Sequence, residues 1–87
     1  MSAATIRIFV PDVPEFRGLV EAAERNPACR VTAPLADYHL IASAEPLEFR
    51  RKDLGLRPAV WYGLFTGGLN GRVELYDRER VRIVPVE

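Results

Sequence analysis

Residues 58–71 read PAVWYGLFTGGLNG, and this stretch contains no charged residue although 28% of the chain is charged. Arg57 and Arg72 bracket it, and it holds the chain's one tryptophan, Trp61. Exposed apolar surface is unfavourable in water, so a stretch of this composition must be buried against something. The surface that covers it is the chain's own sheet, a second copy of the chain or a ligand.

A helix is predicted over residues 58–66 of this stretch. Pro58 suits the first position of a helix, and Gly67 suits the left-handed residue that follows the last turn. At about 100° per residue, the large apolar side chains share one arc and are expected in the core. These side chains are Val60, Trp61, Leu64 and Phe65. The opposite arc is neutral and mostly small, and consists of Pro58, Ala59, Tyr62, Gly63 and Thr66.

The neutral arc allows three interpretations, because a helix arc that faces solvent normally carries charged residues. In the first, the chain's own loops cover it. In the second, it packs on its symmetry mate in a homodimer, where Ala59 and Gly63 permit close approach of another backbone. In the third, it walls a small-molecule pocket that Trp61 and Tyr62 line. The glycines that follow do not indicate a phosphate-binding loop, because they come after a helix and no Gly-Lys-Ser/Thr is present.

Hydrophobic periodicity predicts the elements on both sides of this stretch. Helical spacing predicts a helix over 13–25, with a capping box at Asp12 and Glu15 and an end before Pro27. Strands are predicted at residues 5–10, 29–32, 38–42, 47–50, 72–76 and 80–84. The order is β-α-β-β-β-α-β-β. We therefore expect residues 1–87 to form a single α+β domain, a two-layer sandwich with a mostly antiparallel sheet of five to six strands and two helices on one face.

Charge and composition narrow the class of partner. Twelve basic and twelve acidic residues give a net charge of zero, which disfavours binding to nucleic acid or to an anionic membrane. The chain shows no signal peptide and no membrane span, so a cytoplasmic protein is expected. Cys29 is alone, which excludes an internal disulfide and, with a single histidine, a structural zinc site. Oligomerisation remains as a source of stability for a domain this small.

His39 is the one catalytic candidate, because histidine is the commonest acid–base group in enzymes. General base catalysis would need a substrate pocket and an orienting carboxylate, for which Asp37 and Glu48 are the choices near it in sequence. The ordinary interpretation is a partly exposed strand residue, so no catalytic residue is assigned.

Arg50, Arg51 and Lys52 are consecutive, and together with Arg57 they could form a site for a carboxylate or a phosphate. Acidic residues interleave with them in sequence and nearly cancel the local charge, namely Glu45, Glu48 and Asp53. A solvated strand end is therefore the favoured interpretation of this run.

The sequence motifs of most cofactor-dependent and hydrolytic enzymes are absent, so no cofactor and no metal are expected. We expect a cytoplasmic, non-enzymatic binding or interaction domain that homodimerises through its second helix. The residues expected to bind the partner or a ligand are Arg57, Ala59, Trp61, Tyr62, Gly63 and Thr66. The alternative is a small cofactor-independent enzyme, or an accessory subunit of one. It would have His39 as its acid–base group and, near Trp61 and Tyr62, a pocket for a small apolar or anionic ligand.

Overall fold

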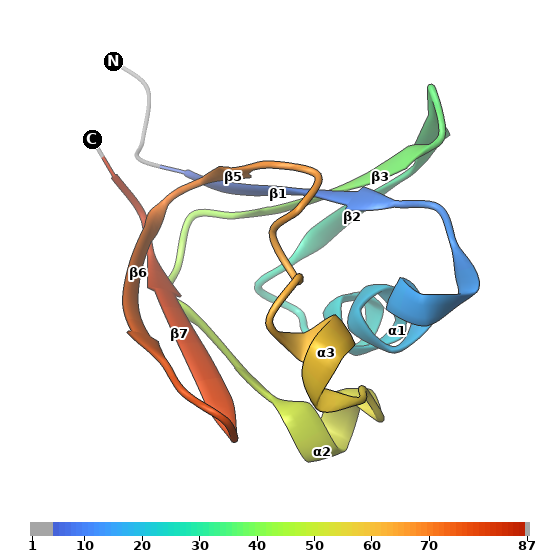
Figure 1. Ribbon diagram of the computed structural model, residues 1–87. Coiled ribbons are helices and arrows are strands. Elements are labelled where there is room, and N and C mark those ends of the chain that lie inside the picture. The colour runs from blue at the N-terminus through green and yellow to red at the C-terminus, as the bar shows by residue number, and fades with distance from the viewer. Residues whose placement is uncertain (1–4, 87) are drawn as a thin grey trace.

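The chain folds as an α+β protein with antiparallel sheets and short helices, which confirms the predicted fold class. The structure is a computed structural model that describes residues 5–86, except for the side chains of residues 33–35 (Figure 1). Its strands are β1 Ile6–Pro11, β2 Arg30–Leu35, β3 Tyr38–Ser43, β4 Leu47–Arg50, β5 Leu69–Asn70, β6 Arg72–Tyr76 and β7 Arg80–Val84. Its helices are the 3-10 turn η1 Pro14–Phe16 and the α-helices α1 Arg17–Arg25, α2 Arg51–Leu54 and α3 Pro58–Trp61.

β1 is a central strand of the first sheet, whose order is β2-β3-β1-β5. Its side chains alternate between buried and exposed, because successive residues of a strand point to opposite faces. Ile6, Ile8 and Val10 are fully buried. β1 pairs antiparallel with β3, with Ile6 opposite Ser43 and Val10 opposite His39. This register decides which residues of the two strands lie side by side near the groove described below.

The predicted single sheet of five to six strands is not confirmed, because the structure has a second sheet with the order β4-β7-β6. The chain passes from one sheet to the other at Gly71: β5, before it, pairs with β1, and β6, after it, pairs with β7. A Cβ on Gly71 would lie 3.0 Å from Ile83 Cγ2 and 3.5 Å from Ile6 Cγ2. Glycine therefore lets the chain bend between two core side chains without displacing them.

The first predicted helix is present as η1 followed by α1, and it ends at Arg25, as the proline that follows requires. The predicted capping box does not form. Val13 is the N-cap residue of η1 and its side chain makes no capping hydrogen bond. Asp12 instead lies within hydrogen-bond distance of His39, which ties the start of the helix to β3.

The second predicted helix, over residues 58–66, is shorter in the structure, where α3 ends at Trp61 and turns follow. Gly63 N donates to Val60 O at 3.0 Å, three residues back instead of the four of an α-helix. Glycine weakens a helix by about 1 kcal/mol relative to alanine. In addition, the Trp61 carbonyl accepts a hydrogen bond from the Tyr76 hydroxyl, which competes with continuation of the helix.

α2 is a helix that the sequence did not predict, so the structure has three short α-helices where two were expected. It follows β4 directly and ends at Gly55, whose φ of 67° is left-handed. α1 packs so closely on α2 that a Cβ on Gly18 would lie 1.9 Å from the Leu54 carbonyl oxygen. The three α-helices lie together below the first sheet and beside the second (Figure 1).

The core fills the space between the two sheets and the helices. Trp61 and Leu64 are fully buried, and Val60 and Phe65 are partly buried and pack against the core. This confirms the apolar arc predicted for residues 58–66. The other buried apolar residues are Ile6, Ile8, Val10, Leu19, Val20, Ala23, Ile41, Leu47, Phe49, Leu54, Leu56, Val81 and Ile83.

The turn between β6 and β7 is held by one carboxylate. Asp77 Oδ1 accepts hydrogen bonds from the backbone N–H groups of Glu79 and Arg80, at 2.8 and 2.9 Å. These hydrogen bonds hold the pKa of Asp77 below its ordinary value of 3.8, because they stabilise the charged form. Trp61 Nε1 donates to the Asp77 carbonyl at 2.6 Å, so the turn is also tied to the core.

We expect Asp77 to make the free energy of unfolding fall in acid. Because the pKa of Asp77 is lowered in the folded chain, its contribution is complete above about pH 3.8 and is lost as the pH falls through the folded pKa. Urea unfolding between about pH 2 and pH 6 should show a shallower pH dependence for Asp77→Asn than for the unmodified chain. Asp53→Asn, at an exposed position of α2, is the control for loss of one charge. Equal pH profiles for the two variants would contradict this prediction.

Candidate functional site

Residues 57–71 cross one face of the molecule, from α3 to β5 at the edge of the first sheet (Figure 1). Ala59, Tyr62 and Thr66 are exposed, with 56% of Tyr62 accessible to solvent, and Gly63 is half-buried. The neutral arc of the sequence therefore faces solvent in the single chain.

Trp61 is fully buried, so it cannot contact a partner directly. Its ring meets the ring of Tyr76 edge-on, with 5.8 Å between centroids. Tyr76 also stacks on Tyr62 at 5.8 Å and meets Phe65 edge-on at 5.6 Å. Burial raises the pKa of Tyr76, as expected for a ring held inside this cluster. Tyr76 thus connects the exposed Tyr62 to the core.

Sequence reasoning did not single out Tyr76, although it ends a strand that was predicted correctly. The register of β6 and β7 shifts between Val73 and Leu75. Because of this bulge, Tyr76 lies opposite the buried Val81, where an unbroken register would place Leu75. The sequence shows the alternation of the strand but carries no sign of the bulge.

Gly67 and Gly68 bring the turn after α3 against β1. The prediction that Gly67 is the left-handed residue is wrong, because Gly68 has the positive φ, at 121°. Gly67 is needed for close approach instead: a Cβ there would lie 2.1 Å from the Phe9 carbonyl oxygen and 2.9 Å from Tyr38 Cε1. Phe9 N donates to Gly68 O at 2.9 Å. Phe9 and Tyr38 are 38% and 41% exposed, so their rings extend the exposed neutral arc.

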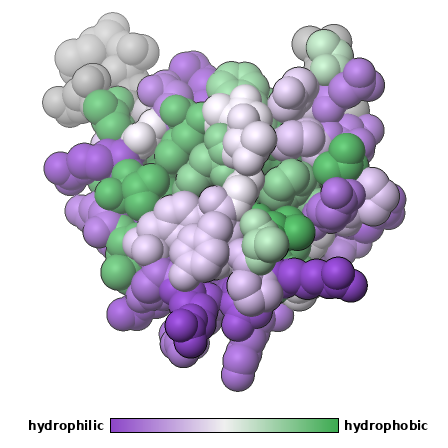
Figure 2. All heavy atoms as spheres, viewed as in Figure 1, coloured by the Kyte–Doolittle hydropathy of each residue, from purple (hydrophilic) through white to green (hydrophobic). Residues whose placement is uncertain are grey.

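We call these residues the neutral surface, defined as the exposed Phe9, Tyr38, Ala59, Tyr62 and Thr66 and the half-buried Gly63. Figure 2 shows the face that α3 crosses, with apolar and neutral side chains over its middle and strongly hydrophilic ones at its rim. Along the lower edge the hydrophilic side chains lie where Figure 1 places α2 and the β6–β7 turn. Arg57 is also exposed, at the start of α3. An apolar patch with a polar rim is typical of an interaction site.

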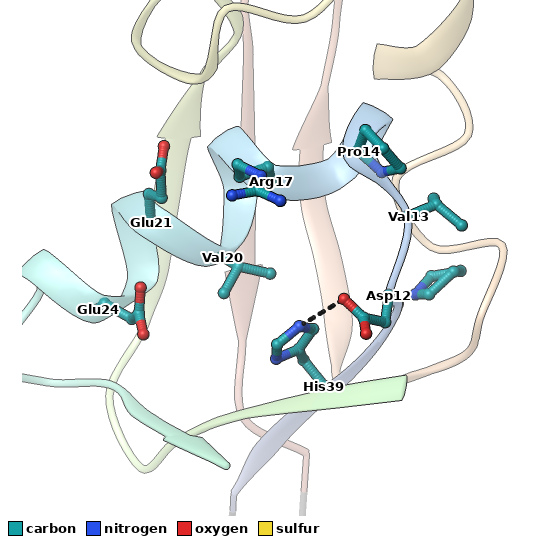
Figure 3. Close-up of a pocket in the computed structure, with 9 residues that line it drawn as sticks. Asp12, Val13, Pro14, Arg17, Val20, Glu21, Glu24 and His39 are labelled. Carbon is teal, nitrogen blue, oxygen red and sulfur yellow. Dashed lines mark hydrogen bonds and ion pairs between the residues drawn. The ribbon is translucent and has the colours of Figure 1, made fainter. Parts of the chain in front are cut away.

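A second candidate region is a groove between α1 and the adjoining ends of β1 and β3 (Figure 3). His39 projects into it with 18% of its side chain exposed, and its Nε2 lies 3.1 Å from Asp12 Oδ1. The cavity measures about 320 Å³, and its other lining residues are Pro11, Val13, Pro14, Arg17, Val20, Glu21 and Glu24.

Asp12 is the carboxylate beside His39, and neither Asp37 nor Glu48 takes this place. The register of β1 and β3 brings Asp12 to the β2–β3 turn, where its N–H donates to the Asp37 carbonyl at 2.8 Å. Pairing the predicted strands 5–10 and 38–42 in sequence would have found this neighbour.

The groove is acidic, and the second nitrogen of its histidine is covered. α1 contributes Arg17, Glu21 and Glu24, which together with Asp12 give three carboxylates and one guanidinium. His39 Nδ1 is buried and has no hydrogen-bond partner among the described residues. A general base must reach the proton that it abstracts. In this conformation a substrate in the groove has no access to Nδ1, and the arrangement holds β3 to the start of the helix.

Across residues 5–86, no three His, Cys, Asp or Glu side chains lie close enough together to hold a metal ion. Cys29 is half-buried and free, and burial raises the pKa of its thiol, which disfavours the reactive thiolate. In the same described part of the chain, no helix is long and apolar enough to cross a membrane.

Two further cavities lie outside the neutral surface and the His39 groove. One lies beside α1 and β4, and the other, of about 210 Å³, lies where α2 meets the β6–β7 turn. Neither Trp61 nor Tyr62 lines these two cavities or the groove. Comparison of the chain with protein-family models, with curated proteins and with solved structures found no significant match.

Proposed function

We propose that this protein is a non-enzymatic binding domain that forms a homodimer through the neutral surface. The observation that carries the proposal is the exposure of Ala59, Tyr62 and Thr66 in a stretch without a charged residue. Burial of neutral and apolar surface of this kind against a second surface is favourable, because it removes the surface from water.

The neutral surface has the properties of an interface between identical copies. Tyrosine is enriched among the residues that dominate binding energy, and Tyr62 is already held by its stack on Tyr76, so little side-chain freedom is lost on binding. The surface carries no charge, so it can meet itself across a two-fold axis without repulsion. Ala59 and Gly63 are small enough for two backbones to approach closely.

The proposed interface includes the exposed rings of β1 and β3. A standard interface buries about 800 Å² per partner, which is about one seventh of the 5738 Å² surface of the chain. A whole aromatic side chain buries about 150–250 Å², and Tyr62 is only 56% exposed, so Tyr62 and its small neighbours fall short. Phe9 and Tyr38, joined to them through Gly67 and Gly68, supply further apolar area.

A cofactor-independent enzyme, or an accessory subunit of one, has less support. It would need a pocket beside Trp61 and Tyr62, but the cavities described above lie elsewhere and Trp61 is fully buried. It would also need an accessible base, and His39 Nδ1 is covered. A small molecule that changed Trp61 emission and raised the melting temperature of the monomer would favour this alternative over the dimer.

Light scattering after size exclusion tests the dimer. At high micromolar concentration we expect twice the 9.8 kDa mass of the chain. Ala59→Arg should return the mass to that of a monomer, because the guanidinium would be buried without a partner. Ala44→Arg is the matched control, at an exposed position between β3 and β4 and outside the neutral surface, and should leave the dimer intact. A monomeric unmodified chain, or the same effect from both variants, would overturn the proposal.

A further inference from the structure

The cavity beside α2 gathers basic side chains from two segments that are distant in sequence. Arg50, Arg51 and Lys52 line it from the β4–α2 junction, and Arg78 and Glu79 line it from the β6–β7 turn. The acidic residues that flank the first segment in sequence do not line the cavity, and Glu79 is the one carboxylate among these five residues. Four bases and one acid give the lining a formal charge of +3 (4 − 1).

Hydrogen bonds hold the two segments together and fix the shape of the cavity. Arg51 N donates to the Glu79 carbonyl at 2.8 Å. The Arg51 side chain donates through Nε to the Arg78 carbonyl at 2.9 Å and through Nη1 to the Leu56 carbonyl at 3.2 Å. A guanidinium has five N–H groups, so Arg51 is anchored and keeps further donors for a ligand. The Asp77 carboxylate fixes the same turn, and a preorganised site loses little freedom on binding.

The basic side chains of this cavity form no ion pair within the described chain, although Arg50 also lines the neighbouring cavity together with Glu48 and Asp53. None of the ion pairs formed by residues 5–86 involves Arg50, Lys52 or Arg78. Arg50 also lies directly opposite Arg80 in the pairing of β4 with β7, and like charges in this position are unfavourable. Arg80 does not line the cavity, but an anion bound there beside Arg50 would weaken this repulsion.

We propose that this cavity binds a small phosphoryl anion, such as inorganic pyrophosphate or the phosphate of a phosphomonoester. A phosphomonoester carries a charge of about −1.5 to −2 at pH 7, and guanidinium groups bind its oxygens in pairs. The cavity of about 210 Å³ has the volume of about seven water molecules at about 30 Å³ each. This is room for one or two phosphoryl groups.

The site goes beyond the proposed dimer and does not depend on it. It lies at the junction of α2 and the β6–β7 turn, and none of its lining residues belongs to the neutral surface. The net charge of the whole chain is zero, so the basic character is local and provides no long-range field for a polyanion. A small multivalent anion matches this distribution of charge.

Inorganic pyrophosphate is the probe for the test, by titration calorimetry and thermal unfolding at an ionic strength matched with sodium chloride. We expect pyrophosphate to bind and to raise the melting temperature above that in sodium chloride. Arg78→Gln removes one guanidinium but keeps the backbone carbonyl that Arg51 binds, and should weaken binding about ten-fold. Lys52→Gln should weaken it in the same direction. Arg30→Gln, at an exposed position of β2, is the matched control and should bind as the unmodified chain does.

Absence of binding beyond that seen in matched sodium chloride would overturn the proposal, and so would equal binding by Arg78→Gln and the control. A short single-stranded oligonucleotide distinguishes the two sources of phosphoryl groups. Displacement of the oligonucleotide by pyrophosphate supports a small-anion site. An oligonucleotide that binds and resists displacement would assign the cavity to a nucleic-acid backbone and contradict the proposal. Light scattering reports the dimer separately, so failure of either proposal is recognised without the other.

Discussion

The Gly67→Ala variant is expected to lose about 2–4 kcal/mol of unfolding free energy. Its methyl group would lie 2.1 Å from the Phe9 carbonyl oxygen, and the backbone cannot yield without separating β5 from β1. Overpacking costs about 1–3 kcal/mol, and loss of the hydrogen bond from Phe9 N to Gly68 O adds about 1 kcal/mol. Domains have about 0.05–0.15 kcal/mol of stability per residue, so one methyl group would remove a large share of the total.

Gly63→Ala is the matched control for this prediction. A Cβ on Gly63 would lie 3.3 Å from Thr66 Oγ1, a side-chain atom that can move aside. We expect a change within about 0.5 kcal/mol. Urea unfolding followed by Trp61 fluorescence measures both variants, at a protein concentration low enough to exclude the dimer. A similar loss in the two variants would show that close contact with β1 is not the cause.

Trp61→Ala is expected to cost about 3–5 kcal/mol. Trp61 is the largest of the fully buried side chains, and it joins α3 to the β6–β7 turn through Nε1 and the Asp77 carbonyl. Its removal would leave a cavity against Tyr76 and an unpaired carbonyl. Because the variant has no tryptophan, circular dichroism replaces fluorescence as the measure of unfolding.

Tyr62→Ala, at the next residue, tests whether the stability lost in Trp61→Ala comes from the burial of the ring or from its aromatic character alone. Tyr62 is 56% exposed and stacks on Tyr76 on one side, so its loss should cost about 1 kcal/mol or less in the monomer. Trp61→Phe should fall between these variants, at about 1–3 kcal/mol, because it keeps most of the packing and loses the indole donor. If Tyr62→Ala were as damaging as Trp61→Ala, burial would not explain the loss of stability in Trp61→Ala.

Six of the seven strands in the described residues could be predicted from sequence, because alternation is a local property. β1 shows this, with Ile6, Ile8 and Val10 on its buried face, whereas the sequence of the two-residue strand β5 indicated part of a turn. The division into two sheets could not be predicted, because it depends on which strands pair, and the close fit of Gly71 between Ile6 and Ile83 exists only in the folded chain. The extent of the second helix was wrong for a similar reason: Tyr76, from another strand, binds the carbonyl at which α3 ends.

The candidate sites also differ in whether their residues are neighbours in sequence or are brought together only by the fold. The neutral arc was visible in sequence because its residues lie within nine positions of one another, from Pro58 to Thr66 (66 − 58 + 1). The contribution of Phe9 and Tyr38 was not visible, because the glycine turn brings those rings to the arc from β1 and β3. Likewise, the basic cavity was not visible, because it brings Arg50 beside Arg78 of the β6–β7 turn. Glu48 and Asp53 flank the basic run in sequence but do not line this cavity in the folded chain.

The passage of the chain through Gly71 also decides when the protein can fold during its synthesis. β1 finds its partner β5 only when Leu69, which pairs with Ile8, has been made, 61 positions later (69 − 8). β4 waits for β7 in the same way. A nascent chain therefore completes the first sheet only after Asn70, and the second only after β7, has left the ribosome, and such long-range pairing slows folding. Until then, the strands made first expose edges that native pairing will cover, and this interval is when the protein is most open to aggregation.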